Sequence, residues 1–520
     1  MADRDYELSV SKLDITEPNV RERQDTTPEN ASILEKQTRT RRLFSSAQLF
    51  CFSLIYLVTW MGMGNNMYYA MLNGGPAAYV FNYIICILGA LSQAACFAEL
   101  SSIIPIAGAQ YYWTFHFAPP RTKRFLTWIQ GWSTWLGYIS ILASSVNVGA
   151  VTVEATVQLN SPDYVNGGWH TTLLVLALLT FYLVVNLWFF RIVPWFELAC
   201  GLANIIFFLI TIIALWVLSP RNPSDFLLTK SSLGGWDNDF LSWNIGLLTQ
   251  VWQFVGLESV IHMGEETKNA RRSAPISMFW SMVVSGVMGF IAVITYTICM
   301  PNIDDMMASS NPFLYLLLAS TGSRALTTFL GAGLILLNMG CNMSVFSSAS
   351  RLTWAWARDG GLPMYFSLVD GKYRVPIRSV LLTWILCALL ALLNIGSGTY
   401  IALGAITSLS SLASYFSYTI ILCVTLHTRL TTGLQTSEWS MGRLGLYVNA
   451  FALIYTVYAM IWLPFPTSLP VDASNMNYCG PVFGAVMIGA LGAWFVWGSR
   501  HWPGPNKDIV EIVLRLASSA

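Results

Sequence analysis

The stretch Trp252-Gln253-Phe254-Val255-Gly256-Leu257-Glu258 lies in an apolar segment and carries a glycine and a carboxylate near its middle. A carboxylate inside a bilayer costs several kcal/mol, so such a residue indicates a functional site. The adjacent glycine predicts a broken helix, which lipid tolerates only where the irregular backbone lines a cavity. The stretch therefore predicts a membrane protein that holds something polar between its helices.

The composition of the chain supports this prediction. Of the 520 residues, 55% are hydrophobic and only 11% are charged, against roughly 25% charged residues in soluble domains. The net charge of +1 argues against a nucleic acid as partner. The nine cysteines show no metal-binding spacing and are mostly expected to pack in apolar spans. A disulfide between Cys299 and Cys479 is the less favoured alternative.

Apolar stretches of about 20 residues are needed to cross a bilayer as helices. The chain has twelve, over residues 46–70, 76–102, 125–152, 171–190, 195–218, 240–263, 275–300, 325–352, 379–395, 399–426, 441–464 and 480–499. With the N-terminus inside, the inner segments hold 25 of the 28 Lys and Arg residues, and the outer loops hold Arg221, Lys230 and Arg324. This bias follows the positive-inside rule and predicts that both termini are cytoplasmic.

The spans predict four parts of the chain. They are a disordered cytoplasmic tail over 1–43, a transport core over 44–426, two further spans over 427–499 and a cytoplasmic tail over 500–520. Glycines interrupt the first span at Trp60-Met61-Gly62-Met63-Gly64 and the sixth at Gly256. Interrupted spans at matching positions of two five-helix halves indicate a transporter site, although membrane helices also use glycine for close packing.

Four motifs resemble the amino acid–polyamine–organocation transporter superfamily. They are Gly74-Gly75-Pro76, the stretch Ile106-Ala107-Gly108-Ala109-Gln110-Tyr111-Tyr112-Trp113, the Trp252–Glu258 run with its trailing Lys268–Pro275 segment, and Ala357-Arg358-Asp359-Gly360-Gly361-Leu362-Pro363. Ala109 stands where the family usually has a second glycine. The chain is most similar to the fungal amino acid/choline permease branch, whose members carry GABA, choline and related amines.

The resemblance implies an all-α polytopic membrane protein with twelve transmembrane helices. Its core would be a five-plus-five inverted repeat (LeuT-like) with helices 1 and 6 broken, followed by two C-terminal helices. Substrate would bind between the breaks, with the positive ends of half-helices facing its carboxylate, and would cross by alternating access. Counted back from Gly74, the first break is expected at Trp60-Met61-Gly62, where Trp60 replaces a common glycine.

The substrate-binding candidates come from both breaks and from span eight. They are Trp60, Met61, Gly62, Gly64, Trp252, Phe254, Val255, Gly256 and Asn338. The face of Trp252 over an amine would contribute about 0.5–2 kcal/mol, and the alternative for Trp252 and Phe254 is ordinary packing. Asn338 lies one helical turn from Asn342, so the pair could line the pocket or, equally, hold helices together.

Glu258 has three interpretations: a partner of the substrate amine, the proton-coupling group, or a cap of the broken helix. We favour coupling or structural support, because Glu258 lies two residues beyond Gly256, and we group Asn342 with it. Some relatives use a lysine of helix five in place of a sodium ion, but span five of this chain has no lysine. Exchange, proton symport and sodium coupling therefore all stay open. The resemblance to fungal permeases favours protons.

The gate candidates lie toward the ends of the central spans. They are Trp135, Tyr138, Glu265, Glu266, Lys268, Arg272, Arg351 and Arg358. We expect Trp135 and Tyr138 above the pocket. At the inner membrane edge we expect salt bridges from the two consecutive glutamates to the basic cluster of Lys268, Arg271 and Arg272.

Three other polar residues need a role near the inner face. Glu99 and Glu197 are expected to be interfacial supports or partners of the two arginines of span eight. His262 with two neighbouring glutamates matches no zinc geometry, so we expect no metal and no cofactor.

The expected function is secondary transport of an amino acid or small amine across the plasma membrane, with the vacuolar membrane as the alternative location. A carrier of choline, a polyamine or an amine-bearing secondary metabolite is the rival within transport. A nutrient receptor would share the fold but usually adds long cytoplasmic extensions. An enzyme would need a nucleophile–base pair or a metal cluster in the spans, and the sequence offers neither.

Overall fold

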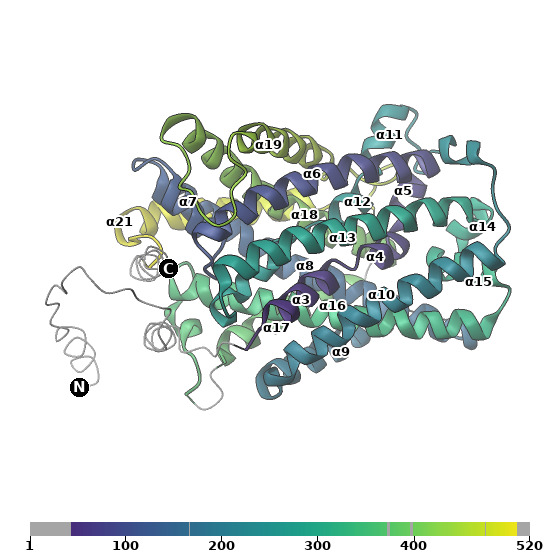
Figure 1. Ribbon diagram of the computed structural model, residues 1–520. Coiled ribbons are helices and arrows are strands. Elements are labelled where there is room, and N and C mark those ends of the chain that lie inside the picture. The colour runs from purple at the N-terminus through teal and green to yellow at the C-terminus, as the bar shows by residue number, and fades with distance from the viewer. Residues whose placement is uncertain (1–42, 166, 372–374, 396–398, 474, 507–520) are drawn as a thin grey trace, which may run out of the picture.

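The computed structural model describes residues 43–506 except 166, 372–374, 396–398 and 474 (Figure 1). Within this part of the chain the regular elements are helices, and the only strand-like pairs are two isolated β-bridges. The tail predicted over 1–43 lies outside the described residues except for Leu43, and so does the C-terminal tail from residue 507. All nine cysteines are free, so Cys299 and Cys479 form no disulfide.

Eleven segments of the described chain are long and apolar enough to cross a bilayer. They are α3 to α5 (Ser46–Leu57, Thr59–Asn65 and Met67–Leu72), α6 (Gly75–Ile103), α8 (Lys123–Asn160), α9 (Gly168–Trp188), α10 (Val193–Leu218), α13 (Ala270–Ile298), α16 (Arg324–Arg358), α17 (Ile377–Ala391), α18 (Thr399–Thr431), α19 (Leu444–Trp462) and α20 (Cys479–Ala493). The sixth predicted span is divided into α11 (Asp239–Ile245), α12 (Leu248–Gln253) and the 3₁₀ helix η3 (Ser259–Glu266). These segments account for the twelve predicted spans and confirm an all-α polytopic membrane protein.

Short helices lie at the two ends of the bundle. They are α7 (Gln110–Phe117), η1 (Phe190–Ile192), η2 (Ser224–Leu228), α14 (Ile303–Ala308), α15 (Pro312–Thr321), η4 (Met364–Ser367), η5 (Leu392–Asn394), the π-helix η6 (Trp494–Gly498) and α21 (Ser499–His501). Figure 1 shows α7 and α21 at one end and α14 and α15 at the other. The charge distribution predicts that the end with α7 and α21 is cytoplasmic.

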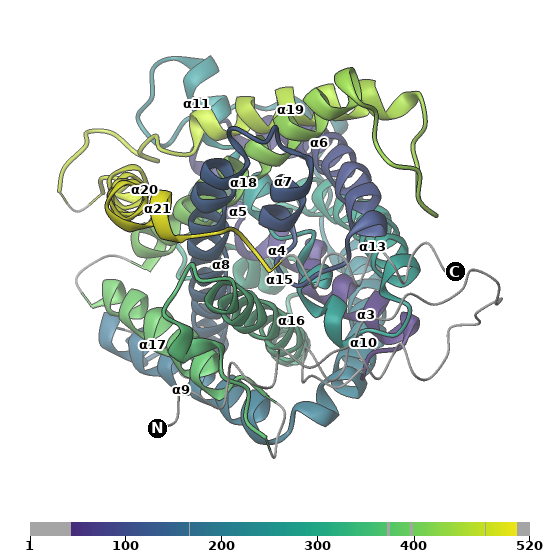
Figure 2. The same cartoon turned by 90° about the vertical axis from the view of Figure 1, so that its left-hand side faces the viewer.

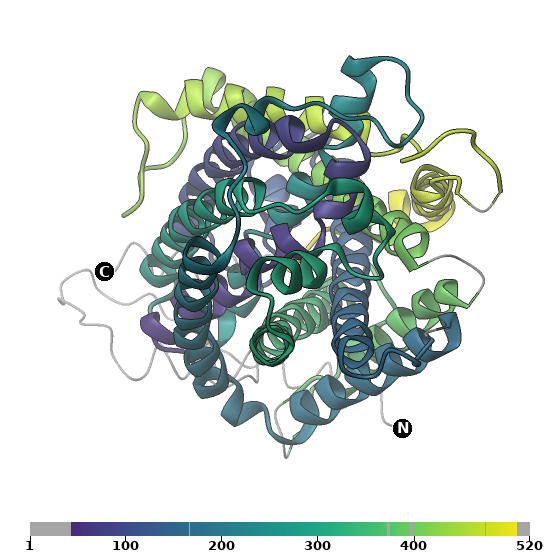
Figure 3. The ribbon, with the colours of Figure 1, turned by 90° about the vertical axis from the view of Figure 1, so that its right-hand side faces the viewer.

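The packing relates the first five spans to the next five. α3 packs on α10 and on α13, and the equivalent α12 packs on α18 and on α6. Equivalent helices of the two halves also pack in pairs: α6 on α13, α8 on α16, and α9 on α17. This pattern is that of the expected five-plus-five repeat. End-on views place α9, α17, α19 and α20 at the periphery of the bundle (Figures 2 and 3).

The first span breaks at Val58, whose backbone is left-handed (φ 30°, ψ 49°) between α3 and α4. The break expected at Trp60–Gly62 is misplaced, because these residues are helical in α4. Gly62 instead permits a close approach, since a Cβ there would overlap the side-chain amide of Gln253. The second break lies where it was predicted, at Gly256, which has a φ of 75°.

Ala109 precedes α7 with φ 43° and ψ −110°, a conformation that glycine adopts far more readily than alanine. It is the position at which the family resemblance leads us to expect glycine. Ala109 is fully buried, and its carbonyl accepts a hydrogen bond from the Trp113 N–H at 3.1 Å. The surrounding fold therefore holds the residue in a strained conformation.

We expect Ala109→Gly to stabilise the protein, because a strained backbone conformation costs on the order of 1 kcal/mol or more. The measurement is the Tm of the purified protein in detergent. Ala107→Gly is the control: it removes a methyl group from the same loop at a residue with negative φ, and should lower the Tm. A fall in Tm for Ala109→Gly would show that Ala109 is unstrained.

Candidate substrate site

A small cavity lies between the two breaks. Its lining residues come from the first, third, sixth and eighth spans: Tyr56, Leu57, Val58, Met61, Gly62, Ile141, Ser145, Val148, Trp252, Gln253, Val255, Asn338, Cys341 and Val345. None of them carries a charge. The cavity volume is about 40 Å³, room for about three waters at roughly 10–15 Å³ each. The walls must therefore move before an amino acid can enter.

Side chains from other spans bind the carbonyl groups that the first break frees. Gln253 donates its amide to the Leu57 carbonyl, and Cys341 Sγ lies 3.2 Å from the Tyr56 carbonyl oxygen. Gln253 reaches Leu57 because Gly62, which it crosses, has no Cβ. The two broken spans are thus joined to each other in the wall of the cavity.

The second break is held by a network around Glu258. The Gly256 N–H donates to the Tyr418 hydroxyl at 3.0 Å, and this hydroxyl donates to Glu258. Glu258 also accepts hydrogen bonds from the Gln110 amide and, at 3.0 Å, from the Tyr138 hydroxyl. It is fully buried and does not line the cavity. Three donors compensate its charge, which favours structural support over direct contact with a substrate amine.

Trp252 is the largest aromatic residue of the lining and is partly exposed. Its Nε1 donates to Ser144 Oγ at 3.1 Å, which fixes the ring. Asn338 also lines the cavity, with its Nδ2 3.5 Å from the Ser145 carbonyl oxygen. Asn342 lies buried behind it and donates to Asn338 Oδ1 at 2.6 Å. The cavity therefore combines one fixed aromatic face with an amide.

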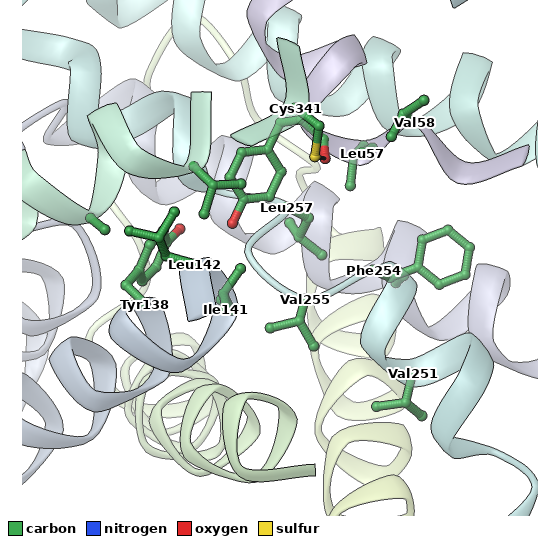
Figure 4. Close-up of a cluster of buried hydrophobic side chains, with 14 of the residues drawn as sticks. Leu57, Val58, Tyr138, Ile141, Leu142, Val251, Phe254, Val255, Leu257 and Cys341 are labelled. Atoms are coloured by element: carbon green, nitrogen blue, oxygen red, sulfur yellow. Dashed lines mark hydrogen bonds between the residues drawn. The ribbon is translucent and has the colours of Figure 1, made fainter. Parts of the chain in front are cut away.

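Five of the nine predicted substrate residues line the cavity: Met61, Gly62, Trp252, Val255 and Asn338. The other four, Trp60, Gly64, Phe254 and Gly256, do not. The Trp60 indole donates to Asn204 Oδ1 at 2.7 Å, away from the cavity. The Phe254 ring packs on Tyr83 with ring centroids 5.7 Å apart, and Figure 4 shows the Phe254 and Val255 side chains pointing in opposite directions.

Several residues that build the site were not singled out from the sequence: Tyr56, Gln110, Ser145, Gln253 and Tyr418. Two of them carried a detectable signal, because Gln110 and Gln253 are polar residues inside the quoted motifs. The others lie in ordinary apolar spans, and only tertiary packing brings them to the breaks.

Two buried ion pairs lie on the predicted cytoplasmic side of the cavity. Arg351 Nε is 3.0 Å from Glu266 Oε1, and Arg358 Nη1 is 3.0 Å from Glu265 Oε2. The Arg351 guanidinium also lies 4.0 Å from the centroid of the Phe190 ring. These pairs join η3 to α16 on that side of the cavity.

The partners expected for these charges were wrong. Lys268 and Arg272 are exposed, and the η3 glutamates pair with the α16 arginines instead. Glu99 does not pair with those arginines either, because it accepts from Arg429 of α18. The packing of α16 against η3 decides these partners, and it cannot be inferred from distance along the chain.

Trp135 and Tyr138 precede the cavity-lining residues of α8, so they lie on the predicted cytoplasmic side of the cavity and not above it. Trp135 Nε1 donates to Thr353 Oγ1 at 3.0 Å. Tyr138 stacks edge-on against His262, with ring centroids 4.5 Å apart. The imidazole Nδ1 of His262 is 2.6 Å from the Ala107 carbonyl oxygen, so this histidine serves the packing below the site.

A further layer beneath the ion pairs gathers around Asp359. Its carboxylate accepts from the hydroxyls of Tyr111 (2.8 Å) and Tyr112 (2.9 Å), and from the Asn506 N–H (3.2 Å). Burial raises the pKa of Asp359, while the adjacent guanidinium and these hydroxyls act in the opposite direction. The indole of Trp502, which is 1% exposed, donates to the Asp359 carbonyl. Figure 2 shows this C-terminal segment crossing the end of the bundle.

Aromatic rings pack near the opposite end of the bundle. The rings of Tyr68 and Tyr400 stack with centroids 4.3 Å apart. The Tyr69 hydroxyl donates to the Tyr400 carbonyl at 2.8 Å. These contacts join α5 to the start of α18, while the polar layers lie on the side with α7.

The chain is similar in sequence to membrane permeases over almost its whole length. The profile of the family described as amino acid permease matches residues 44–489. A choline transporter of Saccharomyces cerevisiae is 26% identical over 487 residues, covering 92% of this chain and 85% of the relative. Amino-acid permease 2 of Neurospora crassa is 26% identical over 478 residues (89% and 86%), and an amino-acid permease BAT1 homolog of Oryza sativa is 25% identical over 484 residues (88% and 91%).

We expect Tyr418→Phe to slow substrate uptake about tenfold or more, because it removes a hydrogen bond to a carboxylate, worth about 1.5–3 kcal/mol, and leaves the Gly256 N–H unpaired. Initial uptake rates in proteoliposomes, at matched protein content, measure the effect. Tyr415→Phe is the matched control, since Tyr415 lies on the same helix, is equally buried, and its hydroxyl bonds to the Tyr455 hydroxyl instead of Glu258. Equal uptake rates in the Tyr418→Phe and Tyr415→Phe variants would show that Tyr418 does not stabilise the second break.

Proposed function

We propose that this chain, which belongs to the amino acid permease family, carries a small amino acid or amine through the cavity between its two broken spans. That it is a multi-pass membrane transporter of the amino acid and amine class follows from the family and its relatives. The identity of the substrate, the route and the driving ion are the content of the proposal.

The uncharged lining of the cavity carries this proposal. Trp252 presents an aromatic face, which attracts an ammonium group, while Asn338 and Ser145 supply polar atoms. No lysine or arginine lines the cavity, so nothing there compensates a net negative substrate. The site suits a zwitterionic amino acid or a single positive amine better than a dicarboxylic amino acid.

Alternating access is supported by the backbone link between the cytoplasmic halves of the broken spans. The Leu43 N–H donates to the Glu266 carbonyl at 2.9 Å, and the Lys268 N–H donates to the Phe44 carbonyl at 3.1 Å. Phe44 and Thr267 form a parallel bridge. In our proposal α3 and η3 move together and open the cavity to the cytoplasm, after the ion pairs of η3 separate.

Choline is the second candidate substrate. The relative named a choline transporter aligns with 92% of this chain. Choline has no carboxylate, and the uncharged lining offers no cation to bind one. Recognition of choline would then rest on the aromatic residues of the lining, Trp252 and Tyr56.

The proposed driving force is the proton gradient, on the resemblance to fungal permeases alone. The distribution of Lys and Arg supports two cytoplasmic termini. The proposed location is the plasma membrane, and the vacuolar membrane is the alternative.

Competition in proteoliposomes tests the substrate. Neutral amino acids and GABA should compete with a labelled neutral amino acid, and glutamate should not. Trp252→Leu should raise KM about 2- to 30-fold, the equivalent of 0.5–2 kcal/mol. The ring of Phe254 packs on Tyr83, away from the cavity. Phe254→Leu should therefore keep KM within about twofold of the wild-type value. If the protein takes up labelled choline and amino acids do not inhibit this uptake, the proposed substrate is choline and not an amino acid.

Imposed gradients test the driving ion. An inward proton gradient should drive accumulation of the labelled substrate, and a protonophore should abolish it, because each substrate is proposed to enter with a proton. The measurement is accumulation at equal membrane potential, with a sodium gradient as the control. Accumulation driven by sodium and indifferent to pH would rule out proton coupling.

A further inference from the structure

One buried carboxyl group differs from the other buried acids of the bundle. Glu197 of α10 is fully buried, and no donor among the described residues lies in good hydrogen-bond geometry with its oxygens, so the Ser344 hydroxyl is a weak partner at most. Glu99 has an arginine, Glu258 has three donors, and Glu154 accepts from the Thr171 hydroxyl at 2.9 Å. An unpaired carboxylate in such surroundings is costly, so the group is expected to be neutral and to carry a proton.

The groups around Glu197 are small and uncharged. Cys51 of α3, Cys200 of α10 and Cys341 of α16 lie near enough to interact electrostatically with it, and Ser344 of α16 lies beside it. The next charges along α16 belong to the Arg351–Glu266 pair, seven residues from Ser344, or about two helical turns. Within the described part of the chain, no cation is among the groups that act on the Glu197 carboxyl.

Its position connects the cavity with the moving half-helix. On α16, Ser344 lies between Cys341, which lines the cavity, and Arg351 of the ion-pair layer. On α10, Glu197 lies one helical turn after Val193, the first residue of the helix. Cys51 of α3 lies in close contact with the backbone of α10 at Gly201, one helical turn after Glu197. The two helices are therefore tightly packed beside Glu197. Movement of α3 would therefore expose Glu197 to cytoplasmic water.

We propose that Glu197 is the group that carries the coupling proton. In the closed state it holds the proton as a carboxylic acid between α3, α10 and α16. When α3 moves away, the O–H bond breaks, the proton passes to a water molecule, and a solvated carboxylate remains. Glu197 must be reprotonated before α3 can pack against it again, which links proton release to the return of the empty carrier. The inference rests on the proton coupling proposed above.

Glu197→Gln tests the inference, because the amide keeps the shape of the side chain but cannot release a proton. We expect accumulation under an inward proton gradient to fall at least tenfold. Counterflow of labelled against unlabelled substrate, without a gradient, should stay within threefold of the wild-type rate. Glu197→Asp should retain proton-driven accumulation. Glu154→Gln, which changes a buried acid with a partner, is the control and should accumulate substrate like the wild type.

Two outcomes would overturn the assignment. Proton-driven accumulation by Glu197→Gln equal to that of the wild type would show that another group carries the proton. Equal loss of counterflow and accumulation in both the Gln and Asp variants would show that Glu197 only fills space. A wild-type protein that ignores the proton gradient would instead contradict the proposed function itself.

Discussion

The need to satisfy the backbone of two broken helices inside an apolar bundle organises this structure. Water is scarce there, so each freed backbone group needs a protein partner. The Leu57 carbonyl is bound by Gln253 from the other broken span, and the Gly256 N–H by Tyr418 from α18. Because one partner comes from the opposite break, the two irregular segments form one shared unit. The substrate cavity is the space beside that unit.

The buried acids of the bundle have separate tasks because their partners differ. Glu258, with three donors, can keep its charge and hold the second break. Glu265 and Glu266 pair with arginines of α16, and in the proposed mechanism these pairs break before the cavity opens to the cytoplasm. Buried ion pairs of this kind add little net stability, but the loss of one partner is costly because it leaves the other charge buried and uncompensated. They therefore suit a closure that must be firm yet reversible.

The sequence predicted the features that depend on local pattern. Span lengths, the break at Gly256 and the aromatic Trp252 follow from hydropathy, a glycine and a motif. The first break could not be found this way, because Val58 is a β-branched residue and nothing in its type suggests a left-handed backbone. Gly62 and Gly64, from which the first break was predicted, instead allow Gln253 and Phe313 to approach the helix closely. Ion-pair partners were also missed, since helix crossings select them.

The close approach of Gln253 to Gly62 limits how this site can evolve. A side chain at position 62 would displace the amide that binds the Leu57 carbonyl, so neither position can drift alone. New substrate preferences must instead arise at lining positions free of backbone duties, such as Met61, Val148 or Val345. Residues 62 and 253 are thus expected to covary among relatives while the rest of the pocket diversifies around them.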